Sequence, residues 1–264
     1  MAATLTKPII IWTRSIADWS QDSTFFDRHL NLVHHIPAIR HVPSTLPPSS
    51  IPESVGLAIV TSSYVASQDI INPWKIHLKG IPIYCVGEKT ARAMRSYNLS
   101  ATHPDHVASA SDLAQWLDKN HPGVTALFLG ADQPAFDWLS WAASSGRPFH
   151  WQSVYQVKKG ITTSSGKPLT AEEKEALRRL DSGVVCFASP SAVEGFCADL
   201  WQEAFFSQNP CDPSFGALPT NLTAIAIGST TGSQCKGRFP VVHVLPKPDV
   251  AYLARKAIEV LALC

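Results

Sequence analysis

Hydrophobic residues along the chain fall in short runs, and each run is followed by a Ser, Thr or Gly and then by a segment of helical periodicity. This alternation is typical of a parallel α/β fold. We expect strands at residues 9–12, 33–39, 57–60, 81–86, 126–129, 150–157, 184–188, 224–227 and 241–245. We expect helices at residues 25–30, 89–97, 111–119, 135–143, 171–180, 192–205 and 249–261. Because the strand runs are apolar throughout, helices should cover both faces of each sheet.

Three short sequence boxes occur twice, in the same order. Residues 61–66 (TSSYVA) are matched by 188–193 (ASPSAV), residues 86–90 (VGEKT) by 227–231 (IGSTT), and residues 111–114 (SDLA) by 248–251 (PDVA). Chance could produce any one of these matches. All three in order favour two similar α/β lobes over a single large sheet.

The two predicted lobes are not contiguous in sequence. The first strand and helix precede the first set of boxes, and the second set begins only after Gly160, so the chain should cross twice between the lobes. We expect one lobe from residues 1–37 plus 160–264, a second from residues 42–154, and linkers at 38–41 and 155–159. The Pro-rich stretch 43–52 and the segment 208–219 are typical of surface connections.

Size and charge narrow the classes of partner. A chain of 264 residues with 45% hydrophobic content is long enough for two domains. Its 22 Lys and Arg balance 21 Asp and Glu, so no global field attracts nucleic acid or an anionic membrane. No apolar run approaches the ~20 residues of a membrane span, and the run at 8–12 is too short for a signal peptide. We expect a cytoplasmic protein that binds any anionic ligand at a local site.

Motifs for metals, cofactors and disulfides are absent from the sequence. The six cysteines include no CxxC pair and lie mostly in apolar runs, which favours buried, reduced thiols. The segment 103–106 (HPDH) lacks the partners of a metal site, so we expect no metal. No dinucleotide-binding glycine pattern, phosphate-binding loop or GxSxG elbow is present, and we expect no cofactor.

Polar residues follow the predicted strands where ligands usually bind. In an open α/β sheet this place lies outside the carboxyl ends of the strands, and helix N-termini there offer N–H donors to carboxylates or phosphates. Each lobe would have two such helix N-termini, and those of one lobe would face those of the other across a cleft. Alternatively, Ser62, Ser189, Thr90 and Thr230 are ordinary helix caps. The residues alone therefore indicate a two-lobed α/β protein with a cleft suited to polyanions.

The ordered segments resemble the uroporphyrinogen-III synthase family. The matching pieces are 12–14 (WTR), 36–39 (IPAI), 59–62 (IVTS), 85–91 (CVGEKTA), 111–114 (SDLA), 154–156 (VYQ), 187–193 (FASPSAV) and 226–231 (AIGSTT). Each is short and weakly specific, but their order extends over nearly the whole chain. The resemblance implies two flavodoxin-like parallel α/β lobes joined by two linkers, with the active site in a central cleft.

The same resemblance implies an activity. Members of the family cyclise hydroxymethylbilane to uroporphyrinogen III, with inversion of ring D and loss of water, in tetrapyrrole (haem) biosynthesis. It implies a monomeric lyase without cofactor or metal, with hydroxymethylbilane synthase as a possible transient partner. The alternative is a non-catalytic bilobed protein that binds a small polyanionic ligand.

The site residues are those that match the family motifs. Tyr155 corresponds to a catalytic tyrosine, whose neutral O–H would assist departure of the hydroxyl group. The alternative is a structural tyrosine at a strand end. The expected substrate contacts are Arg14, Thr61, Ser62, Ser63, Gly87, Lys89, Thr90, Ser189, Ser191, Gly228, Thr230 and Thr231. Lys158 is a further candidate cation.

Two positions depart from the family pattern. Tyr64 follows Ser63 where the family usually has a proline, and Gly232 follows Thr231 where it usually has an alanine. The first departure leaves open which contacts the residues around Ser63 make with the substrate.

Overall fold

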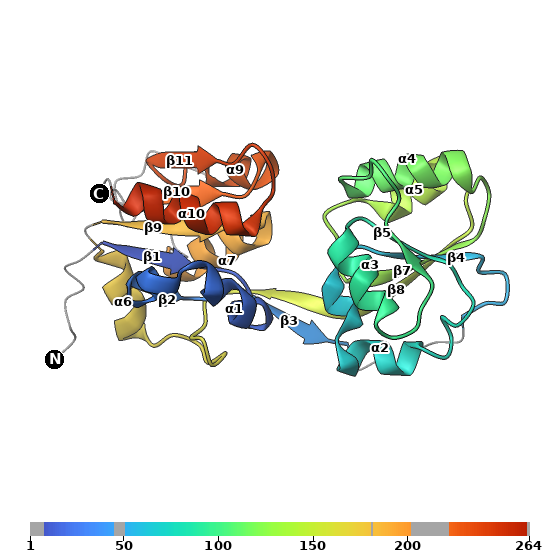
Figure 1. The fold of residues 1–264 in the computed structure, drawn as a ribbon, viewed down its shortest axis with the longest axis horizontal. Helices are drawn as coiled ribbons and strands as arrows, with labels where there is room; N and C mark the ends of the chain where they lie inside the picture. The colour runs from blue at the N-terminus through green and yellow to red at the C-terminus, as the bar shows by residue number, and fades with distance from the viewer. Residues whose placement is uncertain (1–7, 45–50, 181, 202–221, 263–264) are drawn as a thin grey trace. The chain divides into compact units, whose positions relative to one another are not determined.

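The computed structural model describes residues 8–44, 51–180, 182–201 and 222–262. The chain forms two compact units, unit 1 from residues 1–40 and 158–264 and unit 2 from residues 41–157 (Figure 1). The chain passes between them inside strands β3 (Ile39–Pro43) and β8 (Phe149–Lys159), which are hydrogen-bonded neighbours. Each unit is described by itself below.

Unit 1 contains one parallel sheet in the order β11-β10-β9-β1-β2. Its strands are β1 (Ile9–Trp12), β2 (Val33–His35), β9 (Gly183–Phe187), β10 (Leu222–Ala226) and β11 (Val241–Val244). Its helices are α1 (Ile16–Asp22), η1 (Ser23–Phe25), η2 (Asp27–Leu32), α6 (Ala171–Arg178), α7 (Pro190–Leu200), α9 (Ser229–Cys235) and α10 (Val250–Leu261). Numbered along this unit's own chain, the strand order is 2-1-3-4-5, which is the flavodoxin-like order.

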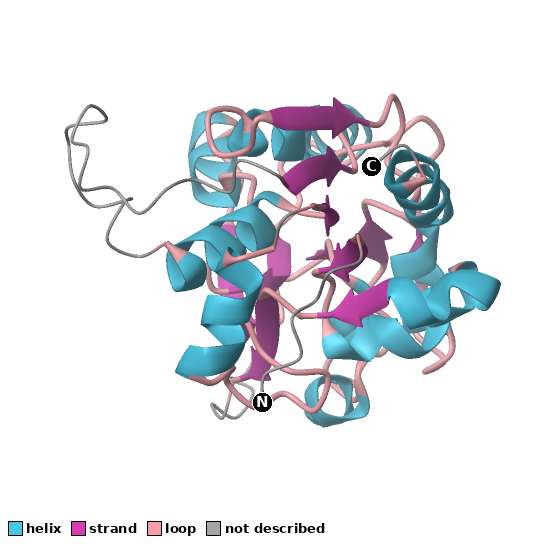
Figure 2. Cartoon of the chain, turned by 90° about the vertical axis from the view of Figure 1, so that its left-hand side faces the viewer, coloured by secondary structure: helices cyan, strands magenta, loops and turns pink. Residues whose placement is uncertain are grey.

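Unit 2 contains a six-stranded sheet in the order β3-β8-β7-β4-β5-β6. Besides β3 and β8, its strands are β4 (Leu57–Val60), β5 (Ile83–Cys85), β6 (Ala101–Thr102) and β7 (Ala126–Ala131). Its helices are η3 (Ser63–Ala66), α2 (Gln68–Trp74), α3 (Glu88–Arg95), α4 (Ala110–Asn120) and α5 (Trp138–Ser144). Figure 2 colours the helices, strands and loops of the described residues by type.

The two sheets have the same spatial succession of strands once β3 is set aside. The succession β8-β7-β4-β5-β6 of unit 2 corresponds to β2-β1-β9-β10-β11 of unit 1. The chain enters the two sheets at different strands, so the units are related by a circular permutation. The repeated boxes therefore follow equivalent strands: β4 and β9, then β5 and β10, then β6 and β11.

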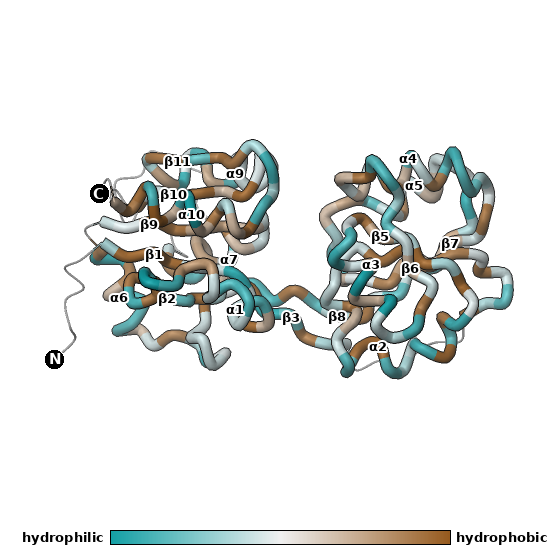
Figure 3. The backbone as a smooth tube through the Cα atoms, in the orientation of Figure 1, coloured by the Kyte–Doolittle hydropathy of each residue, from teal (hydrophilic) through white to brown (hydrophobic). Residues whose placement is uncertain are grey.

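Helices cover both faces of each sheet, as the apolar strands predict. Ile11 of β1 faces the core that contains Phe196 of α7, whereas Trp12 faces the core that contains Leu253 of α10. Strand β4 divides its residues between two cores of unit 2 in the same way. Strands such as β7 and β10 are accordingly hydrophobic over most of their length (Figure 3).

Several elements differ from the sequence-based expectation. The segment expected as a helix at 25–30 forms the short 3₁₀ helices η1 and η2 instead. Helices α1, α2 and α9 and strands β3 and β6 were not expected. Helix α2 contains Pro73, and α9 consists mostly of Ser, Thr and Gly, which have low helix propensity. Helix α7 ends at Leu200, and the rest of the expected helix at 192–205 lies largely outside the described residues.

Within unit 1, helix α7 packs closely against both segments where the chain leaves and returns. A Cβ atom on Gly195 would lie 2.1 Å from the carbonyl oxygen of Ala38 and 2.8 Å from the backbone nitrogen of Gly160. The Gly160 N–H donates to that same Ala38 oxygen at 3.0 Å. One turn further along α7, Asp199 accepts a hydrogen bond from the Ile161 N–H at 2.8 Å. Only glycine permits this approach at position 195.

The expectation of buried, reduced cysteines is confirmed for Cys85, Cys186, Cys197 and Cys235, which are buried and free. Cys211 and Cys264 lie outside the described residues. None of the helices in the described ranges is both long enough and apolar enough to cross a membrane.

Candidate functional site

In unit 2, the carboxyl ends of the adjacent parallel strands β4 and β5 carry the first two boxes. Ser62 caps η3, and its hydroxyl accepts a hydrogen bond from the Tyr64 N–H at 3.2 Å. Gly87 is the N-cap of α3, and a Cβ there would have no heavy atom within 4 Å. Helices η3 and α3 contact one another. The first backbone N–H groups of α3 are therefore open to an approaching ligand on the side of Gly87. Thr61 and Ser63 flank Ser62 and are half-buried.

Tyr155 lies on β8 at the same end of the sheet and is only 5% exposed. Burial raises the pKa of its phenol, and a side-chain hydrogen bond with Ser62 acts in the opposite direction. The structure thus brings Tyr155 together with Ser62, and Tyr155 remains a neutral O–H donor at neutral pH.

Three residues beside Tyr155 were not named as site residues from the sequence. His41 and Tyr64 place their rings against it, and the Asp132 N–H donates to the Tyr155 carbonyl oxygen at 3.0 Å. Asp132 directly follows β7, so the rule that ligands bind at carboxyl strand ends could have identified it. His41 lies on β3, which the hydrophobic pattern did not predict.

Unit 1 repeats this arrangement at β9 and β10. Ser189 caps α7 by accepting a hydrogen bond from the Ala192 N–H at 3.2 Å, and Ser191 lies in the first turn of that helix. Gly228 is the N-cap of α9, again with no heavy atom within 4 Å of a Cβ built there. Helices α7 and α9 contact one another, as η3 and α3 do in unit 2. The capping role of Ser62 and Ser189 is thus observed.

Equivalent positions in the second boxes have similar exposure. Thr90 and Thr231 are buried, at 6% and 4% exposed, whereas Lys89 and Thr230 are exposed. Lys89 and Thr230 are therefore more accessible to a ligand than Thr90 and Thr231. The side chains of the two buried threonines pack within the first turns of α3 and α9.

Gly232, one of the two departures from the family pattern, has a packing explanation. A Cβ at this position would lie 2.4 Å from Cγ2 of Val244 on β11. An alanine would require the Val244 side chain to shift. The small residue at 232 and the valine at 244 therefore fit one another.

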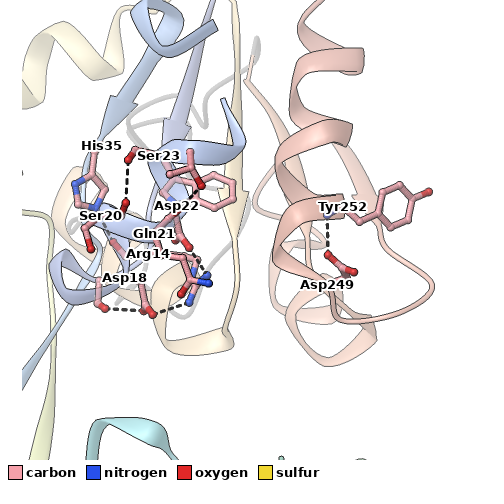
Figure 4. Close-up of polar contacts among 12 residues, drawn as sticks. Arg14, Asp18, Ser20, Gln21, Asp22, Ser23, His35, Asp249 and Tyr252 are labelled. Atoms are coloured by element: carbon pink, nitrogen blue, oxygen red, sulfur yellow. Dashed lines mark hydrogen bonds and ion pairs between the residues drawn. The ribbon is translucent and has the colours of Figure 1, made fainter. Parts of the chain in front are cut away.

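Arg14 follows β1 and forms ion pairs with two carboxylates. Its guanidinium lies 3.0 Å from Asp18 and 3.0 Å from Asp22 (Figure 4). The buried Asp22 also accepts a hydrogen bond from Trp12 Nε1 at 3.0 Å, and the Arg14 carbonyl accepts one from His35 Nε2 at 2.9 Å. Arg14 thus organises the loop after β1. The other candidate cation, Lys158, is exposed on β8.

Three cavities within the individual units lie away from these residues. One of about 270 Å³ in unit 1 is mainly apolar and includes Ile10 and Leu261; a second, of about 400 Å³, includes His34 and Glu173. A third of about 220 Å³ in unit 2 includes Trp74. None of these three is lined by an expected site residue. Within the described ranges, no group of three or more His, Cys, Asp or Glu side chains is placed to hold a metal ion.

Comparisons with known proteins identify the family. The family model of uroporphyrinogen-III synthase HemD matches residues 30–255. The crystal structure of uroporphyrinogen-III synthetase from Helicobacter pylori is similar with a TM-score of 0.63 and 18% identity, covering 96% of this chain and 99% of that one. A mutant uroporphyrinogen III synthase from Thermus thermophilus has a TM-score of 0.55 and 15% identity, covering 97% and 100%. A search of curated proteins gives no significant match. Because the family model spans most of the chain, this protein belongs to the uroporphyrinogen-III synthase family.

Proposed function

We propose that the protein closes the linear tetrapyrrole hydroxymethylbilane to uroporphyrinogen III, with inversion of ring D and loss of water. The observation that carries this proposal is the family match over residues 30–255. The activity makes the protein a cyclising lyase of tetrapyrrole (haem) biosynthesis. A protein that only binds a polyanion is not favoured by that match.

The proposed reaction places specific demands on the protein. The terminal hydroxyl leaves as ring A's pyrrole nitrogen supplies electrons, which gives an electrophilic methylene. The substituted carbon of ring D attacks it to form a spiro intermediate, and fragmentation and reclosure leave ring D inverted. Since the substrate also closes unaided to the wrong isomer, the protein must mainly fix its conformation and shield the intermediate.

Tyr155 is the proposed catalytic residue. Its buried phenol has a raised pKa and stays protonated at neutral pH, so it can donate a hydrogen bond to the departing hydroxyl. The hydrogen bond with Ser62 would stabilise negative charge that develops on the phenol oxygen.

The repeated boxes are the proposed contacts for the substrate's acetate and propionate carboxylates. Backbone N–H groups next to Gly87 and Gly228 are accessible because these residues have no side chain. We assign supporting hydroxyl contacts to Thr61, Ser63, Ser191 and Thr230, and a cationic contact to Lys89. For Thr90, Thr231, Ser62 and Ser189, capping and packing of the first turns is the primary role.

The proposal extends to the oligomeric state, the partner protein and the cellular location. We propose a cytoplasmic monomer that receives its substrate from hydroxymethylbilane synthase, since that intermediate is unstable in solution. Light scattering of the purified protein should give one chain's mass. A mixture with the synthase should co-migrate in gel filtration at micromolar concentration if the two proteins associate, and separate peaks would contradict the contact.

A coupled assay tests the activity. Hydroxymethylbilane is generated in situ, the protein is added, and the oxidised porphyrin isomers are separated by chromatography. We expect predominantly the type III isomer. Type I alone, as from spontaneous closure, would contradict the proposed function and leave a binding protein.

A further inference from the structure

The ring of Tyr155 is held by two neighbouring aromatic rings of unit 2. The Tyr64 ring lies 5.0 Å from it, centroid to centroid, at 72°, and the His41 ring lies 5.5 Å from it at 76°. Both are edge-to-face contacts, the geometry that aromatic pairs prefer. His41 and Tyr64 also stack on one another at 4.5 Å. The three rings therefore form one closed cluster in which each touches the other two.

Tyr64 connects this cluster to the hydrogen-bonding partner of the phenol. Its backbone N–H donates to the Ser62 hydroxyl oxygen at 3.2 Å, and the same Ser62 side chain hydrogen-bonds Tyr155. Its own hydroxyl donates to the backbone oxygen of His41 at 3.3 Å, which ties η3 to β3. A single residue thus contacts the ring of Tyr155 and fixes the group that bonds its oxygen.

We propose that Tyr64 is a positioning residue for Tyr155, holding its ring by edge-to-face contact and its partner Ser62 by a backbone hydrogen bond. This inference rests on the proposed function, in which Tyr155 donates to the departing hydroxyl. Tyr64 acts through Tyr155, since its own hydroxyl is engaged with the His41 backbone.

The expected size of the effect follows from the geometry that the reaction needs. A displacement of the order of 1 Å in a catalytic group can cost about 10²-fold in rate. Tyr155 remains packed in its core after loss of one neighbouring ring, so we expect the smaller loss of about tenfold in Tyr64→Leu. Tyr64→Phe keeps the ring and the backbone N–H, and should retain most of the activity.

The kinetic test measures type III formation and the ratio of type III to type I product. We expect Tyr64→Leu to lower kcat about tenfold with little change in KM and to raise the type I fraction. Tyr64→Phe should stay within about threefold of the wild-type kcat. Tyr84→Leu is the matched control, because Tyr84 is a half-buried tyrosine of the same unit that packs in the opposite core against Trp116 and His121. Tyr64→Met replaces the leucine variant if that variant does not fold.

A spectroscopic test reads the surroundings of the Tyr155 phenol. The chain has five tyrosines, so protein labelled with 13C at tyrosine Cζ gives few resonances, and that of Tyr155 is assigned by its loss in Tyr155→Phe. We expect Tyr64→Leu to shift this resonance and Tyr84→Leu to leave it in place.

The two tests separate the possible failures. An unchanged Tyr155 resonance in Tyr64→Leu, or an unchanged rate and isomer ratio, would overturn the positioning role. A shifted resonance in a protein whose wild type forms no type III product would overturn the proposed function instead.

Discussion

The Arg14 guanidinium lies 3.0 Å from the carboxylate of Asp22, whose side chain is only 3% exposed. A second carboxylate, that of Asp18, pairs with the same guanidinium. An arginine chosen from the sequence as a substrate cation is therefore balanced by two acids of its own unit. Its first role is to neutralise a buried charge at the end of β1.

Replacing Arg14 with methionine should consequently destabilise unit 1. Loss of one partner leaves a charge in the interior, which costs about 3 kcal/mol in comparable buried pairs. Urea unfolding should show this loss relative to wild type, and Arg92→Met, which removes an exposed cation on α3, serves as the control. If Arg14→Met is as stable as the control and instead binds substrate poorly, Arg14 is a substrate contact rather than a structural ion pair.

Tyr155→Phe should lower the rate of type III closure several-fold or more while leaving the fold intact. The variant loses the O–H donor but keeps the ring that packs in the core, so the free energy of unfolding should change by no more than about 1 kcal/mol. The coupled assay and urea unfolding check both values. Tyr97→Phe, which changes a half-buried tyrosine packed against the same core, should match wild type. A wild-type rate in Tyr155→Phe would make Tyr155 purely structural.

Gly87→Ala and Gly228→Ala should weaken substrate binding while leaving stability nearly unchanged. A methyl group at either position meets no heavy atom within 4 Å, so the stability cost is confined to a less favourable N-cap, at most about 1 kcal/mol. A substrate that approaches the backbone N–H groups would meet that methyl group. We expect a higher KM at nearly unchanged stability, measured in the coupled assay. Unchanged KM in both variants would remove these two glycines from the substrate contacts.

Gly195→Ala should instead lower the stability of the protein. Its new methyl group would lie 2.1 Å from the Ala38 carbonyl oxygen, which is backbone and cannot rotate away. We expect a loss of about 2–3 kcal/mol or more, as in overpacked cores, read from urea unfolding against Gly87→Ala. Equal stability of the two alanine variants would mean that α7 moves freely away from the segments it contacts.

Alkaline pH should weaken the native state through the buried thiols. Burial raises the pKa of Cys85, Cys197 and Cys235 from 9.0 to about 12, so unfolded thiols ionise while native thiols stay protonated. The unfolded state then loses protons first, and the free energy of unfolding falls as pH rises from about 9 towards 12.

Urea unfolding at several pH values, in a protein carrying Cys211→Ser and Cys264→Ser, measures this decline. The decline should be shallower when Cys235→Ala is added. The described thiols should also resist a thiol reagent until the protein unfolds. Rapid modification of the native protein would contradict their burial.

The sequence predicted those parts of the fold that depend on local pattern. Apolar runs located β1 and β4 to the residue, and helical periodicity predicted the helices α3 and α7, which follow Gly87 and Ser189. Helix α9 was missed because its residues have poor helix propensity, and packing of Cys235 against the core favours it instead. Strand β3 (IRHVP) contains an arginine and a histidine and ends in a proline, so it lacks an apolar run.

Contacts in the candidate site were harder to predict, because they join residues that are distant in sequence. The hydrogen bond between Ser62 and Tyr155 requires β4 and β8 to be placed in the same sheet first. The ring contacts of Tyr64 depend in addition on the unpredicted strand that carries His41. Strand-end position could be inferred from sequence, whereas the partner of each side chain depends on the tertiary fold.

The insertion of unit 2 into the chain of unit 1 also bears on how the protein is made. All strands of the unit 2 sheet have been synthesised once residue 159 has been added, whereas Ile9 of β1 pairs with Gly183 of β9. During translation, β1 and β2 therefore emerge long before the strands that complete their sheet. Their apolar residues stay unburied in that sheet until β9 has been synthesised. Unit 2 can complete its sheet first, whereas the apolar residues of β1 lack their β9 partner until later and are exposed to aggregation in that interval.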